Sequence, residues 1–147
     1  MRLVSVSSAF VFMACTAASA DAIADSCRFL DIVGGEKRAL VEPMFSDLAS
    51  GWPQESRANA VASVEAVIDE LAFAGGNVYE LARLGEDYAD HLIAIRLAGG
   101  ELTAARLTYE YAPTGLRLTG MNFKRRMSEM LPVGALASLE PVVCPDG

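Results

Sequence analysis

Residues 78–126, VYELARLGEDYADHLIAIRLAGGELTAARLTYEYAPTGLRLTGMNFKRR, decide the fold of this chain. Apolar and polar residues alternate over four runs, at 78–84, 88–98, 102–112 and 115–126, and a period of two predicts β-strands. Short turns containing Gly or Pro separate the runs. Connections this short join antiparallel neighbours, so we expect a four-stranded antiparallel meander.

Side-chain parity predicts which residues share a face of this sheet. His91 lies on one face of the second strand with isoleucines, and Leu107 and Tyr109 lie on the more apolar face of the third. These odd-numbered positions oppose each other if the three-residue turn between the strands contains a left-handed Gly. We therefore expect His91 opposite Leu107 or Tyr109, with Tyr79 and Leu81 of the first strand on the same face.

The fourth run changes parity along its length. Leu116 and Leu118 have one parity, whereas Met121 and Phe123 have the other. A β-bulge adds one residue to a strand and so exchanges its two faces. We expect such a bulge at Thr119-Gly120, which places all four apolar side chains on the core side.

The chain before the sheet has helical periodicity. One apolar stripe recurs at helical spacing after Pro53, at Val61, Val64, Ile68 and Leu71, and predicts an amphipathic helix that Gly75-Gly76 would end. Two helical runs around Gly34-Gly35 precede it, and Pro43 must kink the second run or begin a new helix. Helices followed by strands predict an α+β domain, with N-terminal helices packed on a curved four-stranded antiparallel meander.

The N-terminus has the pattern of a secretory signal peptide. Met1 and Arg2 form a short basic start, residues 3–14 are almost wholly apolar, and Ala18-Ser19-Ala20 is a small-residue cleavage pattern. The apolar stretch is shorter than the roughly 20 residues of a membrane span. We therefore expect a signal peptide at 1–20, a single domain at 21–147, and a periplasmic or secreted protein.

A lipid anchor is the alternative for this leader. Cys15 ends the sequence Phe-Met-Ala-Cys, which loosely resembles the box in which a bacterial lipoprotein cysteine is acylated. Cleavage after Ala20 would instead remove Cys15 together with the leader.

Ordinary cleavage leaves two cysteines, Cys27 and Cys144, near the two ends of the mature domain. An even pair in an oxidising compartment predicts a disulfide, which would tie the apolar C-terminal tail back to the domain. Two free thiols are the alternative. A redox-active pair is disfavoured because catalytic cysteines usually lie close together as Cys-x-x-Cys.

The chain is acidic, with a formal net charge of −7 at pH 7, and loss of Arg2 with the leader makes it more negative. Such a surface repels nucleic-acid phosphates and anionic lipid heads. We expect neither nucleic acid nor, after signal cleavage, a membrane as partner.

The order of elements over residues 29–126 resembles the nuclear transport factor 2-like superfamily, the cystatin-like α+β cones. The resemblance rests on the FLDIVGG opening at 29–35 and on LTYEY at 107–111, which leads through a Pro-Thr-Gly turn into LRLTGMNF at 116–123. Small secreted bacterial members show a similar aromatic strand, turn and final strand. The aromatic anchor that members often place at the start of the last strand is Leu116 here. The superfamily includes isomerases, dehydratases, ligand carriers and non-catalytic domains, so the resemblance implies architecture and leaves activity open.

Acidic residues around His91 look at first like a metal site. On a strand, however, Asp90 and His91 point to opposite faces, and the chain has one histidine. A metal needs three or four convergent ligands, so we expect no metal site. Phosphate-cradling loops and nucleophile elbows are also absent from the sequence, and we expect no cofactor.

His91 and Tyr109 are the weak candidates for catalysis. A histidine beside a tyrosine in a cone pocket can transfer protons if a carboxylate orients it. Asp90 and Glu110, the carboxylates considered for this role, fall on the other face. A space-filling histidine bonded to a phenol is therefore favoured over an acid/base enzyme.

Five residues of the sheet are candidates for lining a ligand pocket, although packing in the core is the favoured interpretation because the apolar face of a half-buried sheet has this pattern: Tyr79, His91, Tyr109, Tyr111 and Phe123. We therefore expect an exported non-catalytic domain that binds a partner protein or a small apolar ligand. The outer face of the sheet would suit pairing of two copies into a homodimer, through Leu92, Ala94, Leu102 and Ala104.

Overall fold

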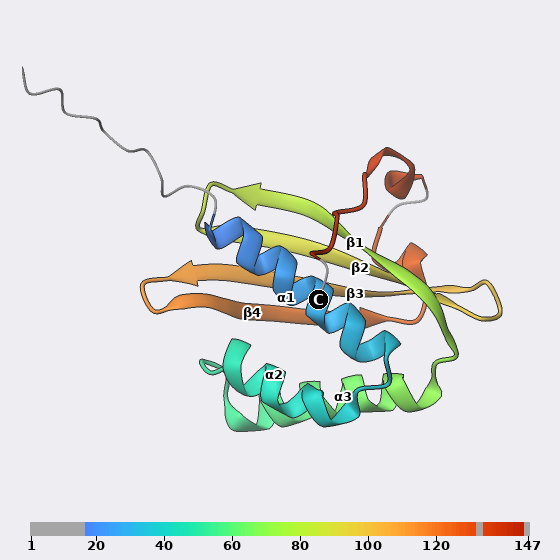
Figure 1. The fold of residues 1–147 in the computed structure, drawn as a ribbon, viewed down its shortest axis with the longest axis horizontal. Helices are drawn as coiled ribbons and strands as arrows, with labels where there is room; N and C mark the ends of the chain where they lie inside the picture. Colours follow the sequence, from blue (N-terminus) through green and yellow to red (C-terminus); the bar gives the residue numbers. More distant parts are fainter. Residues whose placement is uncertain (1–16, 132–133, 146–147) are drawn as a thin grey trace, which may run out of the picture.

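The computed structural model describes residues 17–131 and 134–145 (Figure 1). Within these ranges three α-helices precede a four-stranded antiparallel sheet, which confirms the predicted α+β class. The helices are α1 (Ala17–Gly34), α2 (Val41–Leu48) and α3 (Gln54–Glu70). A short 3-10 turn, η1 (Arg38–Leu40), leads into α2, so Pro43 lies in the first turn of a new helix, where its missing N–H costs nothing.

The sheet has the order β1-β2-β3-β4. Its strands are β1 (Phe73–Leu84), β2 (Tyr88–Leu97), β3 (Leu102–Ala112) and β4 (Gly115–Lys124). The sequence predicted that Gly75 and Gly76 would end α3. This prediction was wrong, because α3 ends at Glu70 and both glycines lie inside β1. A Cβ at Gly76 would lie 2.6 Å from Leu30 Cδ1 and 2.9 Å from the Ala94 carbonyl oxygen, so this glycine serves close packing.

The register between β1 and β2 corrects one prediction. His91 opposes Leu107 on β3 as expected, but on β1 it opposes Glu80, and Tyr79 opposes Leu92 on the outer face. A bulge at Leu81, between the pairs formed by Glu80 and Ala82, adds one residue to β1. Because of this extra residue, the side chains before it in β1 lie on the opposite face from the one predicted. Tyr79 therefore points away from the core, and Glu80 points toward His91.

The predicted bulge in β4 is confirmed. Thr108 pairs with Gly120 and Tyr109 pairs with Leu118, which leaves Thr119 as the extra residue. The bulge brings the apolar side chains on both sides of it against the core, at Leu116, Leu118, Met121 and Phe123.

The core lies between the helices and the inner face of the sheet. Helix α1 contacts all four strands, while α2 and α3 pack against each other (Figure 1). Fully buried residues of this layer include Phe29, Ile32, Phe45, Ile93 and Leu107. Helix α1 and the sheet therefore enclose the polar residues of the inner face between them.

The outer face of the sheet is covered by the chain that follows β4. Met127, in the 3-10 turn η2 (Met127–Glu129), packs on Leu92, Ala94 and Ala104 together with Met130 and Leu131. Of the four residues predicted to pair two copies, the structure leaves Leu102 exposed. Measuring the size of the purified protein at two concentrations tests the predicted homodimer.

The C-terminal tail returns to α1 (Figure 1), and there Cys144 forms the predicted disulfide with Cys27. The S–S distance is 2.05 Å, and the bond joins positions 117 residues apart. Beside it, the Val142 N–H donates to the Val78 carbonyl at 2.8 Å, so the tail also binds the edge of β1. The tail is therefore joined to α1 by the disulfide and to β1 by a backbone hydrogen bond.

Most of the predicted leader, including Cys15, lies outside the described residues. Its last part, 17–20, is helical and continuous with the rest of α1. None of the described helices combines the length and the apolarity of a membrane span.

Candidate functional site

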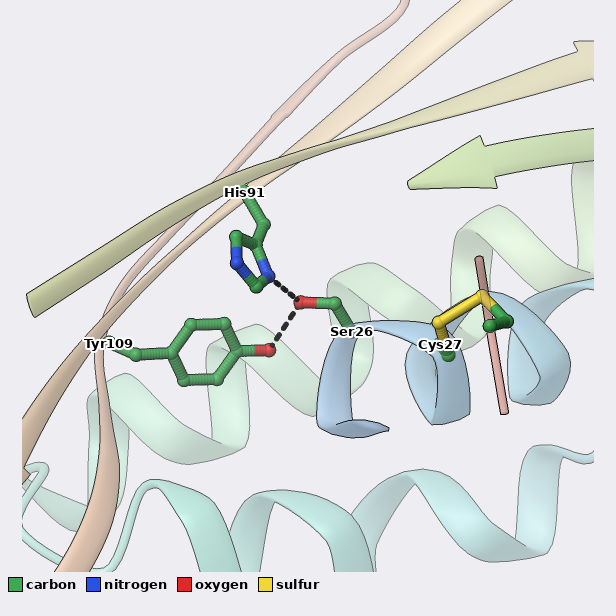
Figure 2. Close-up of a disulfide and its surroundings, with 5 residues drawn as sticks. Ser26, Cys27, His91 and Tyr109 are labelled. Atoms are coloured by element: carbon green, nitrogen blue, oxygen red, sulfur yellow. Dashed lines mark hydrogen bonds between the residues drawn. A yellow bond between two sulfur atoms is a disulfide. The ribbon is translucent and has the colours of Figure 1, made fainter. Parts of the chain in front are cut away.

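Three buried polar side chains meet between α1 and the sheet (Figure 2). Ser26 Oγ lies 2.8 Å from His91 Nδ1 and 3.0 Å from the Tyr109 hydroxyl. All three residues are fully buried. Figure 2 shows Ser26 pointing from α1 toward both rings, while its neighbour Cys27 points elsewhere and carries the disulfide.

The fold places each member of this cluster on a different element. Ser26 shares the buried stripe of α1 with Ala22 and Phe29, at helical spacings of four and three residues. His91 and Tyr109 come from β2 and β3, and their rings make an edge contact with centroids 5.6 Å apart. The structure thus brings the two sequence candidates together and adds Ser26, which the sequence analysis missed.

Ser26 precedes the helical runs predicted around Gly34-Gly35, so it was not among the predicted site residues. Extending the helix toward Asp21 aligns Ala22, Ser26, Phe29 and Val33 on one stripe, and a polar residue inside an apolar stripe marks a buried hydrogen bond. That stripe was the available signal.

Glu80 supplies the carboxylate that the sequence analysis did not find. Its Oε2 lies 3.7 Å from His91 Nε2, which is beyond hydrogen-bonding distance but close enough for electrostatic attraction. Glu80 also accepts a hydrogen bond from Arg83 Nη2 at 2.8 Å. Within the described residues, His91 Nε2 has no hydrogen-bond partner.

The protons of this cluster have one favourable arrangement. With its proton on Nε2, facing Glu80, His91 accepts at Nδ1 from the Ser26 hydroxyl, whose oxygen accepts from Tyr109. The opposite tautomer would direct the Nε2 lone pair at a carboxylate. The cluster is therefore a directional chain from phenol to hydroxyl to imidazole, with a carboxylate at its end.

Burial keeps the cluster neutral. Burial lowers the pKa of His91, although Glu80 and Asp90 partly oppose this effect by attracting the imidazolium. Burial likewise raises the pKa of the Tyr109 phenol, and the hydrogen bond with Ser26 opposes it. At the residue directly before Ser26 on α1, burial raises the pKa of Asp25 to about 6, with Arg28 opposing the effect.

The order carboxylate, imidazole, hydroxyl is the order of a catalytic triad. A substrate, however, has to reach the serine oxygen, and Ser26 is completely covered. The space beside Tyr109 has a volume of about 10 Å³ and is bounded by Ala22, Ala89 and Tyr111, among others. This volume holds about one water molecule. In this conformation the cluster acts as a polar link between α1 and the sheet.

The five candidate pocket residues do not lie together in the structure. Tyr79 packs on the outer face, and Tyr111 is partly exposed beside the small space next to Tyr109. His91 is inside the buried cluster. Phe123 lines a much larger cavity at the other end of the sheet. The five candidates therefore do not form one pocket.

The larger cavity has a volume of about 810 Å³. Its lining residues come from the end of α3, the ends of β2 and β4, the start of β3 and the segment after β4. Figure 1 shows these strand ends at one end of the sheet. The apolar wall of the cavity is formed by Val67, Leu71, Leu97, Leu102, Phe123 and Met127. Four charged residues also line it, Glu70, Glu101, Arg125 and Arg126. A cavity with this lining suits a small molecule with an apolar body.

Asp90 and His91 point to opposite faces of the sheet, which confirms the prediction from side-chain parity. Asp90 is buried on the outer face, where it accepts hydrogen bonds from Arg106 Nε at 2.9 Å and from Arg106 Nη2. Over residues 17–131 and 134–145, no group of three or more His, Cys, Asp or Glu side chains is arranged to hold a metal ion.

Comparison of the chain with protein-family models, curated proteins and solved structures returns no match.

Proposed function

We propose that this protein is an exported, non-catalytic α+β domain that binds a small apolar ligand in the cavity between α3 and the end of the sheet. One observation carries the proposal. The cavity at Phe123 measures about 810 Å³, whereas the space beside His91 and Tyr109 measures about 10 Å³. Small-ligand pockets measure roughly 300 to 1,000 Å³, so the first has room for a ligand and the second does not.

The walls of this cavity are mostly apolar and come from regular elements. Val67 belongs to α3, Leu97 to β2, Leu102 to β3 and Phe123 to β4. Burial of a ligand against such side chains contributes roughly 25 cal/mol for each Å² of apolar surface removed from water. Apolar contact is therefore the main source of affinity in this proposal.

Export is supported by the leader pattern and by the disulfide. Disulfides persist in oxidising compartments, and Cys27 and Cys144 are bonded. Helices packed on a four-stranded meander are also consistent with a cone of the nuclear transport factor 2-like type, a superfamily that includes ligand carriers. The mass of the protein from its own cells tests export. A chain starting at Asp21 supports it, a lipid-modified Cys15 indicates the alternative anchor, and an intact Met1 contradicts both.

Binding is tested by titrating the purified protein with a neutral naphthylamine fluorophore, whose emission rises in apolar surroundings. Leu102 lines the cavity, whereas Leu84 is exposed at the opposite end of the sheet. We expect Leu102→Ser to weaken binding about threefold to tenfold and Leu84→Ser to leave it unchanged. Val67→Trp, which narrows the cavity without filling it, should weaken binding as well. Equal effects of the two serine variants, or no binding by the wild type, would reject the proposal and favour a partner protein.

An acid/base enzyme is the second candidate, because Glu80, His91, Ser26 and Tyr109 are ordered as a triad with a phenol beside it. This function requires α1 to move away and expose Ser26. A fluorophosphonate probe, which labels activated serines, distinguishes the two functions. We expect no labelling of Ser26, and labelling that disappears in His91→Ala would favour the enzyme.

A further inference from the structure

We propose that the ligand of this cavity is an apolar amino acid or a similar amphiphile, with a carboxylate bound by Arg126 and an ammonium group bound by Glu101. This inference rests on the proposed function and names the chemical class of its ligand. It comes from the charged residues of the cavity rather than from its apolar wall.

Two of the four charged residues around the cavity neutralise each other. Arg125 Nη2 lies 3.1 Å from Glu70 Oε2. The other two, Arg126 and Glu101, are exposed to solvent and form no ion pair within the described part of the chain. The cavity therefore presents one available cation and one available anion.

These two charges lie at the same end of the sheet. Glu101 immediately precedes β3, which starts at Leu102. The β3–β4 ladder ends at the pair Ala104 and Lys124. Arg126 lies two residues after Lys124, and its backbone is still extended. Both residues therefore belong to the strand ends that border the cavity, and a ligand seated there can meet one cation and one anion.

Neutral polar groups of the cavity are less suited to recognise a head group. The Thr103 hydroxyl already donates to the Lys124 carbonyl at 2.7 Å. A guanidinium binds a carboxylate through two parallel hydrogen bonds, and a carboxylate accepts from an ammonium. A neutral ligand would leave both charges unpaired, and a simple anion or cation would leave one. Because the chain carries a net charge of −7, a simple anion would also be repelled at long range.

The test compares ligands that differ only in their head group. The neutral fluorophore is displaced with dodecanol, dodecanoate, dodecylamine and α-aminododecanoate at low salt. We expect α-aminododecanoate to bind most tightly, about threefold to tenfold above each singly charged ligand, as partly exposed ion pairs contribute little more than this.

Substitution of each charge assigns its role. Arg126→Gln should reduce the affinity for α-aminododecanoate to that for dodecylamine, and Glu101→Gln should reduce it to that for dodecanoate. Neither substitution should change the affinity for dodecanol. The matched control is Arg117→Gln, at the opposite end of the sheet, where Arg117 donates to Thr114. It should change none of the affinities.

The outcomes separate this inference from the function on which it rests. If dodecanol binds as tightly as α-aminododecanoate, the head-group assignment is wrong and the apolar site stands. Tighter binding of dodecylphosphocholine would overturn the amino acid in favour of a zwitterionic lipid. If neither the fluorophore nor any of the ligands binds, both proposals fail.

Discussion

Ser26 Oγ lies 2.8 Å from His91 Nδ1 and so joins the middle of α1 to β2 through a fully buried hydrogen bond. A buried imidazole and a buried hydroxyl each lose water on folding, and each recovers a partner only in this alignment of helix and sheet. The bond therefore specifies where α1 lies on the inner face, in addition to stabilising it.

We expect Ser26→Ala to lower the free energy of unfolding by about 2 to 3 kcal/mol, because it leaves both His91 Nδ1 and the Tyr109 hydroxyl without their shared partner. Urea denaturation followed by circular dichroism measures the change. Ser63→Ala is the matched control, since Ser63 is exposed on α3 and should cost less than about 0.5 kcal/mol. Equal costs for both variants would show that the buried link contributes nothing.

The pKa of His91 is lowered in the folded protein, so the unfolded chain binds this proton more tightly. The free energy of unfolding should therefore fall as the pH drops below about 6.5, the value of an unperturbed histidine. The groups that face the ring are Glu80, Ser26 and Tyr109. His91→Asn should remove this part of the pH dependence, as measured by urea denaturation at several pH values. An unchanged slope would contradict the assignment.

The contribution of Asp25 to the pH dependence of the free energy of unfolding has the opposite sign to that of His91. Burial raises the pKa of Asp25 to about 6, so the folded protein binds this proton more tightly than the unfolded chain does. Its contribution to the free energy of unfolding should rise as the pH falls from about 6 toward about 4. Asp25→Asn, which keeps the side chain neutral, should stabilise the protein at neutral pH by about 1 kcal/mol, allowing for partial exposure. Asp25→Asn should also make the free energy of unfolding fall more steeply in acid. Protonation of Asp25 no longer offsets the destabilising protonation of His91.

The arrangement of the sheet could be predicted from its sequence because each physical signal was local. Alternation located the strands, and the change of parity at Thr119 located a bulge that the structure contains. The bulge at Leu81 left no such signal, since the residues on both sides of it are mixed in polarity. That bulge decides which of Tyr79 and Glu80 faces the core.

The candidate site was less predictable than the sheet because part of it depends on features that leave no local signal in the sequence. His91 and Tyr109 could be found because they share the parity of the apolar face. Glu80 reaches His91 only through the bulge, and the cavity at Phe123 depends on how α3 and the segment after β4 approach the end of the sheet. Such long-range packing is not encoded in the spacing of residues along one element.

The disulfide between Cys27 and Cys144 closes nearly the whole domain, with a separation of 117 residues. Restriction of the unfolded chain by a loop of this length contributes up to about 4 to 5 kcal/mol. We expect the double variant Cys27→Ser, Cys144→Ser to lose about 2 to 5 kcal/mol of unfolding free energy, measured by urea denaturation. Reductant should destabilise the wild type and leave the double variant unchanged. A wild type that is indifferent to reductant would show that the bond adds no stability.

Gly76 allows α1 to approach β1 closely. A Cβ at this position would lie 2.6 Å from Leu30 Cδ1 and 2.9 Å from the Ala94 carbonyl oxygen, both closer than normal contacts. We expect Gly76→Ala to lower the free energy of unfolding by about 1 to 3 kcal/mol, as overpacking does in other cores. Gly51→Ala is the control, because a Cβ at Gly51 meets nothing within 4 Å.

A double-mutant cycle with Leu30→Ala identifies which contact is responsible. The Leu30 methyl group belongs to a flexible side chain, whereas the Ala94 carbonyl is fixed in the ladder between β1 and β2. If the helix is the obstacle, Gly76→Ala should cost less in the Leu30→Ala background, with a coupling of about 0.5 kcal/mol or more. Strictly additive costs would place the clash in the sheet, and a cost no larger than that of Gly51→Ala would show that α1 does not need this glycine.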